Sequence, residues 1–380
     1  MDIPTTSPSL LFTIGSFLVV ITILVFVHEM GHFLVARFFK VKVDAFSIGF
    51  GRELIGFTDK LGTRWKIAPF PVGGYVKFAG DANAASTPSQ LPNDLPPEEQ
   101  AKLFQNKPLY QRALIVAAGP LVNFLFAILV FAGLFMTLGQ PYSEPVITSL
   151  LDPSPGKEAG FEPGDRILAI NGSTVKTFEE VRDFVVVRPN VQIEMTVQRG
   201  EGTKTLSVTP MLDRQVDRFG NEFERGLIGL YASRPAFIER GPIEALYYGT
   251  IATWQQLGNM MDGLWQIVSG RISVDQLSGP VRIAKLSGEV ASVSAISLVQ
   301  FMAFISISLG LVNLFPIPML DGGHLLFYGY EAVRRRPPSL KSQEAAMYAG
   351  LATVLGSSLF VTWNDLKALK VWEGLSKLVS

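Results

Sequence analysis

Residues 10–35 read LLFTIGSFLVVITILVFVHEMGHFLV, an apolar run whose second half contains two histidines and a glutamate. The run exceeds the roughly 20 residues that an α-helix needs to cross a bilayer. It therefore predicts a transmembrane helix that carries ionisable side chains. Because such groups are costly in lipid and usually have a function there, His28, Glu29 and His32 are the first candidates for a functional site.

The composition of the whole chain favours a membrane protein. Of the 380 residues, 48% are hydrophobic and 17% are charged, and the mean hydropathy is +0.30. Such a chain suits several membrane spans with an extramembrane part. The formal net charge is zero, so the basic surface that nucleic-acid binding requires is missing. Because there is no cysteine, a metal site has to use histidine and carboxylate ligands.

Four stretches are long and apolar enough to span a bilayer. They are Leu10 to Val35, Ala113 to Leu138, Leu298 to Tyr328 and Ala345 to Thr362. The first lacks the basic n-region of a cleaved signal peptide, so we expect it to remain as an anchor. The predicted fold is a polytopic α-helical membrane protein with about four transmembrane helices.

Lysine and arginine residues gather on one side of these spans. The clusters are Arg37, Lys40 and Lys42 after the first span, Lys107 and Arg112 before the second, and Arg334, Arg335 and Arg336 after the third. The positive-inside rule makes this side the cytoplasm. The N-terminus and the long segment from about Gly139 to Ser297 are then predicted to lie outside. Lysines beyond the fourth span weakly oppose this orientation.

His28-Glu29-Met30-Gly31-His32 has the spacing HExxH. On a helix, residues i and i+4 share a face, so the two imidazoles can bind one Zn²⁺ while Glu29 acts as general base. A catalytic zinc takes three protein ligands and keeps one position open. The alternative is a pair of buried histidines that hydrogen-bond to backbone or water.

Asp321 is the candidate third ligand because it is the only acidic residue in the third apolar stretch. Prolines and glycines on either side of it interrupt the helix, and irregular backbone at membrane depth is tolerated only in a protein interior or beside a wet cavity. At ~1.5 Å per residue, His28 and Asp321 lie at a similar depth, towards the cytoplasmic leaflet. His324 could replace Asp321 as a ligand or support the site, and Asp321 could instead only bind freed backbone amides.

The HExxH pattern and the stretch NLFPIPMLDGGH (313–324) together resemble the site-2 protease family of intramembrane zinc metalloproteases, in particular its bacterial regulator-of-sigma-E protease branch. The resemblance covers nearly the full chain and includes GPLVNF (119–124) and LSGP (277–280). It implies a bacterial inner-membrane protein with its active site towards the cytoplasm. The implied zinc ligands are His28, His32 and Asp321, with Glu29 as general base and Asn313 as a substrate-contacting amide.

The resemblance also implies a membrane-associated β-hairpin within Trp65 to Phe78. Apolar and small residues alternate there around a Gly73-Gly74 turn, which suits an edge strand that can hold an extended peptide. A transmembrane substrate has to unwind, because its scissile carbonyl is otherwise hydrogen-bonded in a helix. The predicted substrate-binding residues are Gly73, Gly74, Tyr75 and Asn313. An Asn313 that only joins two spans is the alternative.

The outer segment is predicted to hold an extracytoplasmic α+β domain. Short β-like runs such as RILAI (166–170) and VQIEMTV (191–197) flank one helical stretch, FEEVRDFV (178–185). The string SPGKEAGFEPGDRILAINGSTVKTFEEVRDF (154–184) resembles a PDZ domain of the bacterial protease-associated kind. PDZ folds bind extended peptides at a sheet edge. A plug that excludes bulky proteins without binding peptide is the alternative.

These patterns divide the chain into four parts. Residues 1–140 hold the first two spans with HExxH, a cytoplasmic loop and the hairpin, and residues 141–229 form the PDZ-like domain. Residues 230–297 form an extracytoplasmic amphipathic helical linker that contains Trp254 and Trp265. Residues 298–380 hold the last two spans with LDGGH.

The predicted function is an intramembrane zinc metalloendopeptidase that cleaves transmembrane segments of single-pass membrane proteins, such as an anti-sigma factor, in regulated intramembrane proteolysis. Its expected partners are Zn²⁺, this substrate, the lipid bilayer and a peptide or periplasmic protein at the PDZ-like domain. The alternative is a proteolytically silent zinc-binding adaptor, which would not need Glu29. A metal transporter is disfavoured because the polar groups converge on one point instead of following several spans.

Overall fold

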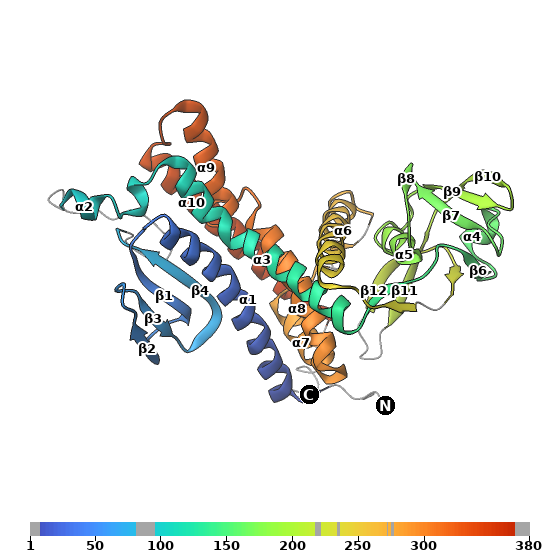
Figure 1. Cartoon of the computed structure of the whole chain (residues 1–380), viewed down its shortest axis with the longest axis horizontal. Helices are drawn as coiled ribbons and strands as arrows, with labels where there is room; N and C mark the ends of the chain where they lie inside the picture. The colour runs from blue at the N-terminus through green and yellow to red at the C-terminus, as the bar shows by residue number, and fades with distance from the viewer. Residues whose placement is uncertain are drawn as a thin grey trace, which may run out of the picture. The chain divides into compact units, whose positions relative to one another are not determined.

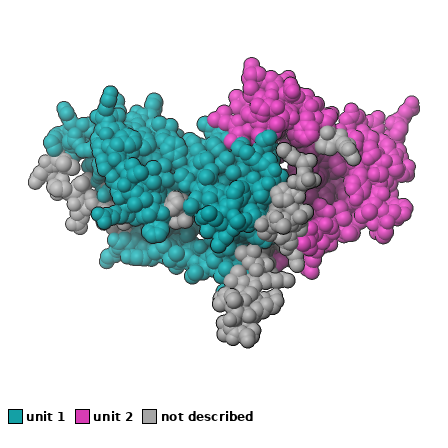
Figure 2. Space-filling view, turned by 90° about the horizontal axis from the view of Figure 1, so that it is seen from below, with its two compact units in different colours: residues 1–128, 279–380 teal, residues 129–278 magenta. Residues whose placement is uncertain are grey.

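The structure is a computed structural model that describes residues 8–80, 96–216, 222–233, 236–271, 273–274 and 277–368. The chain divides into two compact units, residues 1–128 with 279–380 and residues 129–278 (Figure 2). Residues 81–95, which belong to the cytoplasmic loop predicted within residues 1–140, lie outside the described residues.

Four helices of the described part are long and apolar enough to cross a membrane, as predicted. They are α1 (Leu10–Phe38), α3 (Leu109–Thr137), α8 (Ala295–Asn313) and α10 (Leu340–Ala368). The predicted interruption of the third apolar stretch is present, since α8 ends at Asn313 and α9 (Asp321–Arg334) begins as a separate helix, so the stretch to Tyr328 is not one continuous span. Pro316 and Pro318 explain the break, because proline has no amide to donate and disfavours helix in the residue before it.

Two shorter helices and a 3₁₀ turn complete the helices of the first unit: α2 (Pro97–Gln100), η1 (Phe104–Asn106) and α7 (Pro280–Val293). The LSGP stretch lies just before and at the start of α7. There the amides of Gly279 and Arg282 donate to the two carboxylate oxygens of Asp365 in α10, at 3.1 and 2.9 Å. Asp365 thus joins the end of α10 to the start of α7, and its carboxylate complements the positive end of that helix.

A four-stranded sheet packs beside α1 (Figure 1). Its strands are β1 (Val43–Phe50), β2 (Ile55–Thr58), β3 (Arg64–Ile67) and β4 (Phe70–Phe78), in the order β2-β3-β1-β4. β1 pairs with β3 in parallel and with β4 antiparallel, which leaves β4 at one edge. A buried cluster that includes Phe33, Phe46, Val76 and Ile115 joins the sheet to α1 and α3.

The predicted hairpin with a turn at Gly73-Gly74 is wrong, because β4 runs straight through both glycines and Gly74 pairs with Ile48 of β1. A Cβ at position 73 would lie 2.4 Å from the Phe50 ring. A Cβ at position 74 would lie 2.7 Å from the Ser47 carbonyl oxygen and 2.8 Å from Val25. The glycines therefore permit close packing of β4 against β1 and α1. The predicted edge strand is present, although its partner is β1.

The second unit holds an α+β domain, as predicted. Its main sheet is antiparallel in the order β10-β9-β7-β8 and is formed by β7 (Arg166–Ile170), β8 (Ser173–Thr174), β9 (Ile193–Arg199) and β10 (Gly202–Val208). Three strand pairs accompany it: β6 (Ile147–Leu150) with β13 (Leu230–Ala232), β11 (Met211–Val216) with β12 (Glu222–Leu227), and β5 (Gln140–Tyr142) with β14 (Ala236–Ile238). The helices of this domain are α4 (Pro155–Glu158) and α5 (Phe178–Val186).

Asp165 is the aspartate of the Gly-Asp pair that directly precedes β7, and its role in this domain is structural. Its side chain is fully buried and accepts hydrogen bonds from Nε and Nη2 of Arg199, both at 2.7 Å, and from the Glu162 amide at 3.0 Å. Burial alone would raise the pKa of Asp165, but these hydrogen bonds outweigh it and hold the pKa below the usual value of an aspartate. The charged carboxylate thus fastens the turn before β7 to β9.

The predicted amphipathic helix is α6 (Pro242–Val268). Its buried residues include Ala245, Gly249 and Thr253. Trp254 and Trp265 lie on its exposed side.

Replacing Gly31 by alanine should weaken the packing of α1 on α3. The new Cβ would lie 2.5 Å from the carbonyl oxygen of Ala118, and a backbone atom cannot rotate away. Overpacking of this kind costs about 1–3 kcal/mol, so the unfolding temperature of the detergent-solubilised protein should fall. Gly15→Ala is the matched control, because nothing lies within 4 Å of its new Cβ. An unfolding temperature in Gly31→Ala equal to that of Gly15→Ala would contradict this contact.

Candidate metal centre

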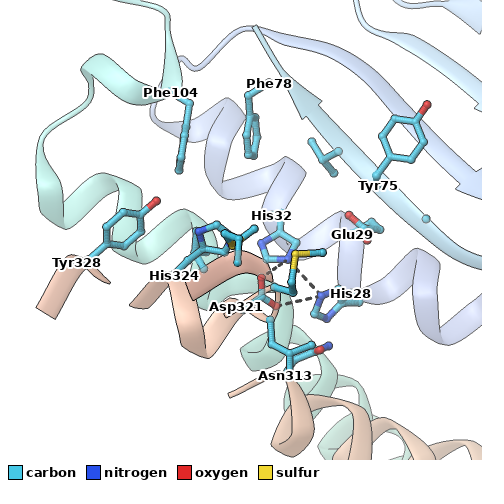
Figure 3. Close-up of a pocket in the computed structure, with 16 residues that line it drawn as sticks. His28, Glu29, His32, Tyr75, Phe78, Phe104, Asn313, Asp321, His324 and Tyr328 are labelled. Atoms are coloured by element: carbon cyan, nitrogen blue, oxygen red, sulfur yellow. Dashed lines mark hydrogen bonds and ion pairs between the residues drawn. The ribbon is translucent and has the colours of Figure 1, made fainter. Parts of the chain in front are cut away.

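Helix α1 and the first residue of α9 bring three metal-ligating side chains together (Figure 3). His28 Nε2 lies 3.2 Å from Asp321 Oδ2, and His32 Nε2 lies 3.5 Å from Asp321 Oδ1. The two Nε2 atoms are 3.2 Å apart. The side chains are 11% exposed for each histidine and 17% for Asp321, so the cluster is mostly shielded from solvent.

The backbone before α9 determines where Asp321 lies. Residues 314–320 fold back on the first turn of the helix, with Met319 at a φ of 85°. A Cβ at Gly322 would lie 2.3 Å from the carbonyl oxygens of Leu314 and Phe315, and one at Gly323 would lie 2.4 Å from that of Ile317. Only glycine fits at both positions. The LDGG sequence therefore lets the chain turn tightly enough to aim Asp321 at α1.

Helix α3 supports both histidines. His32 Nδ1 lies 2.8 Å from the Ile115 carbonyl oxygen, which can only accept, so Nδ1 carries the hydrogen and Nε2 is free to bind a metal. A Cβ at Gly119 would lie 2.2 Å from His32 Nε2, so the glycine leaves room for the imidazole. Four residues later, the Asn123 amide lies 3.0 Å from His28 Nδ1.

Gly119 and Asn123 both lie within GPLVNF (119–124), and neither had a predicted role in the site. The signal that could have revealed them is their spacing. A glycine and an asparagine four residues apart share one face of an apolar helix, and a buried amide needs a polar partner.

The donor set fits a zinc ion. Zinc bonds to nitrogen and oxygen of about 2.0–2.1 Å, taken at tetrahedral angles, separate the ligand atoms by roughly 3.3 Å. The contacts among His28, His32 and Asp321 run from 3.2 to 3.5 Å, and one ligand atom from each lies within 4.8 Å of the others. Two imidazoles with one carboxylate form a ligand set found in catalytic zinc sites, which keep a further position for water or substrate.

A cavity of about 230 Å³ opens beside the three ligands. Glu29, Asn313, Gly74 and Tyr75 line it, and they come from α1, α8 and β4. The carboxylate of Glu29 accepts a hydrogen bond from the backbone amide of Val76 in β4. The cavity therefore combines the ligand cluster, a carboxylate that is not a ligand and the edge of a strand.

Two residues that the sequence singled out are not among the three convergent ligands. Gly73 is not among the residues that line the cavity and packs against the Phe50 ring. His324 lines the cavity, but the group of three convergent ligand atoms contains Asp321 in its place.

Comparisons with known proteins identify relatives of the whole chain. A family model described as Peptidase family M50 matches residues 16–357. A provisionally named zinc metalloprotease of Rhizobium meliloti is 43% identical over 366 residues, which cover 95% of this chain and 98% of that protein. Another from Agrobacterium fabrum is 44% identical over 358 residues, with 93% and 95% covered. The metalloprotease MmpA of Caulobacter vibrioides is 36% identical over 392 residues, with 97% and 98% covered.

Among solved structures, the PDZ domain of the SdrC-like protein from Listeria monocytogenes matches 24% of this chain and 90% of that chain. The sequence identity is 19% and the TM-score is 0.20, which is too low to establish the fold of the matched segment.

The chain belongs to Peptidase family M50, the site-2 protease family. It is a multi-pass membrane protein and a zinc metalloprotease.

Replacing Asp321 by alanine should abolish stable zinc binding, because only the two imidazoles of the cluster remain. We expect the zinc affinity to fall by at least the ~100-fold that the loss of a supporting residue can cost. The measurement is the zinc content of the purified protein after dialysis against a weak chelator. Asp44→Ala, which removes an exposed carboxylate from β1, is the control and should retain zinc. A full zinc complement in Asp321→Ala would show that Asp321 is not a ligand.

Proposed function

We propose that this metalloprotease cleaves peptide bonds within transmembrane segments of single-pass membrane proteins, as in the regulated cleavage of an anti-sigma factor. The observation that carries the proposal is the position of the ligand cluster. His28 and His32 belong to an apolar helix of 29 residues that is long enough to span a bilayer. Asp321 follows the break after a second such helix, α8.

We assign the zinc ligands to His28, His32 and Asp321. When bound there, zinc acts as a Lewis acid that polarises the scissile carbonyl and increases the acidity of water. Glu29 lies in the same cavity without being one of the three convergent ligands, so its carboxylate remains free for proton transfer. It takes a proton from the attacking water and gives it to the leaving amine.

We assign substrate binding to the edge of β4 and to Asn313. β4 has a strand partner on one side only, and Gly74 and Tyr75 line the cavity. An extended peptide that adds to this edge keeps its own backbone hydrogen-bonded after it has left the helix. Asn313 lines the cavity from the end of α8, where its amide can bind a freed backbone group of the substrate. Gly73 contributes indirectly, by letting β4 pack against Phe50.

We further propose the orientation in the membrane and the division of the chain into four parts that the sequence predicts. Arg37 near the end of α1, Arg112 near the start of α3 and Arg334 at the end of α9 favour a cytoplasmic position for these helix ends. The bacterial inner membrane then holds the spans, with the N-terminus and the PDZ-like domain in the periplasm. The boundaries 1–140, 141–229, 230–297 and 298–380 stay predictions.

We propose a PDZ-like role for residues 141–229. β13, which directly follows these residues in the chain, pairs with β6 on one side only in the described structure, so its other edge can accept an added strand. A small cavity between α5 and the chain from Arg225 to Leu230 has apolar walls that include Val181, Val185 and Ile228. A short extended peptide from a substrate or a periplasmic partner fits this combination of strand edge and apolar groove.

The silent adaptor is the weaker hypothesis. An adaptor needs the zinc ligands and the PDZ-like domain, but it has no use for a carboxylate beside the metal ligands. A partly buried carboxylate in an apolar helix is costly, so the position of Glu29 in this cavity favours a catalytic role.

Replacing Glu29 by glutamine should leave zinc bound and stop catalysis. The amide keeps the shape of the side chain but cannot accept a proton, and the loss of a general base lowers the rate by roughly 10²–10⁴-fold. The measurements are zinc content and cleavage of a single-pass membrane reporter in proteoliposomes. Glu98→Gln, at an exposed position in α2, is the control and should cleave normally. Undiminished cleavage by Glu29→Gln would refute the assigned base.

Two glycines placed next to the cleavage position of the reporter should raise kcat/KM. Each glycine weakens a helix by about 1 kcal/mol, so two of them reduce the cost of unwinding and speed cleavage by up to roughly thirtyfold. The same pair placed in the soluble part of the reporter is the control and should have no effect. An identical rate for both reporters would mean that the substrate does not have to unwind before cleavage.

A further inference from the structure

Asn123 is a fully buried asparagine in α3 whose amide is only half satisfied. Its Nδ2 lies 3.0 Å from His28 Nδ1. Its Oδ1 is buried and has no hydrogen-bond partner in the described structure. An orphaned buried carbonyl beside a candidate metal ligand is unusual, because nearly all buried polar side-chain atoms find a partner.

The chemistry of a metal-binding histidine determines what His28 needs from this neighbour. His28 Nε2 faces His32 Nε2 and Asp321 Oδ2, each at 3.2 Å, so Nε2 is the atom directed at the metal position. An imidazole that binds a metal through Nε2 carries its hydrogen on Nδ1. Nδ1 is then a donor and requires an acceptor, whereas the Nδ2 group of Asn123 is also a donor.

A half-turn of the Asn123 amide about its last side-chain bond resolves this conflict. The oxygen and nitrogen of an amide have nearly the same size, and their assignment follows from the hydrogen-bond network. The half-turn places Oδ1 against the Nδ1–H of His28 and leaves only the NH₂ group without a partner. In the unturned orientation, the Nδ1–H of a metal-bound His28 would face the NH₂ group of Asn123, which is also a donor. The Oδ1 of Asn123 would remain without a hydrogen-bond partner as well.

We propose that Asn123 is a positioning residue for the metal centre. Its side-chain oxygen accepts the Nδ1–H hydrogen bond of His28 and thereby holds the tautomer that presents Nε2 to zinc. The proposal rests on the proposed role of His28 as a ligand. It gives His28 the same kind of support that the Ile115 carbonyl gives His32 at 2.8 Å.

Helix α8 holds Asn123 in place. The Ser306 hydroxyl donates to the Asn123 backbone carbonyl at 2.9 Å. One turn further on, a Cβ at Gly310 would lie 3.1 Å from the Pro120 carbonyl oxygen, so α3 and α8 are in close contact here. The helix that ends in Asn313 thus fixes the residue that orients His28.

The test is the zinc affinity of the full-length detergent-solubilised protein, measured by competition with a chromophoric chelator. Asn123→Asp keeps an acceptor and removes the NH₂ donor, whereas Asn123→Leu removes both and keeps the branched shape of the side chain. Asn364→Leu is the matched control, because Asn364 is also a buried asparagine with an orphaned side-chain atom but belongs to α10.

We expect Asn123→Leu to bind zinc roughly 10–100-fold more weakly than wild type, the usual cost of losing a residue that supports a ligand. Asn123→Asp should bind at least as tightly as wild type, and Asn364→Leu should be unchanged. Zinc affinity in Asn123→Leu equal to wild type would overturn the proposal. So would an Asn123→Asp variant as weak as Asn123→Leu, since that result requires the asparagine to be a donor.

Two further measurements distinguish a wrong role of Asn123 from misfolding of the variant and from a wrong ligand set. If Asn123→Leu does not fold, judged by its unfolding temperature, Asn123→Asp alone distinguishes an acceptor from a donor. His28→Ala tests the ligand itself. Zinc retained in His28→Ala refutes the proposed ligand set, whereas zinc lost in His28→Ala but kept in Asn123→Leu refutes only the role of Asn123.

Discussion

The site depends on gathering two imidazoles and a carboxylate at one point among helices that are otherwise apolar. Each of these groups is expensive to bury alone, and their mutual contacts of 3.2–3.5 Å are those of ligands that share one divalent ion. Around this cluster the chain also collects Glu29, the edge of β4 and Asn313. A metal, a base and a peptide-binding edge are the components that hydrolysis of an unwound helix requires.

Glycine residues allow the helices and the strand around the metal ligands to pack closely. At Gly31 and Gly119 a side chain would strike α3 or the imidazole of His32, and at Gly74 it would strike β1 and α1. At Gly322 it would strike the carbonyls of the segment before α9. Each of these glycines lies on an element that contributes to the site, so close packing around the centre depends on the missing Cβ. These glycines preorganise the site through close packing, without supplying any reacting group.

Much of the metal centre could be predicted from local sequence patterns. The i, i+4 spacing on a helix pairs His28 with His32, and Asp321 is conspicuous as the single acidic residue of its stretch. Non-local packing could not be predicted. Gly73-Gly74 looks like a turn because its true partner, β1, is distant in the sequence, and the pairing between them appears only in three dimensions. Asn123 had no predicted role because its partner His28 lies 95 residues earlier in the chain.

X-ray absorption at the zinc edge, on the purified full-length protein, tests the metal centre most directly. The proposed centre predicts one zinc ion per chain with two imidazole ligands and oxygen completing the shell, and the loss of the bound zinc in His28→Ala or His32→Ala. A spectrum with fewer than two imidazoles, or one that neither substitution changes, would contradict the assignment of the metal to this cluster.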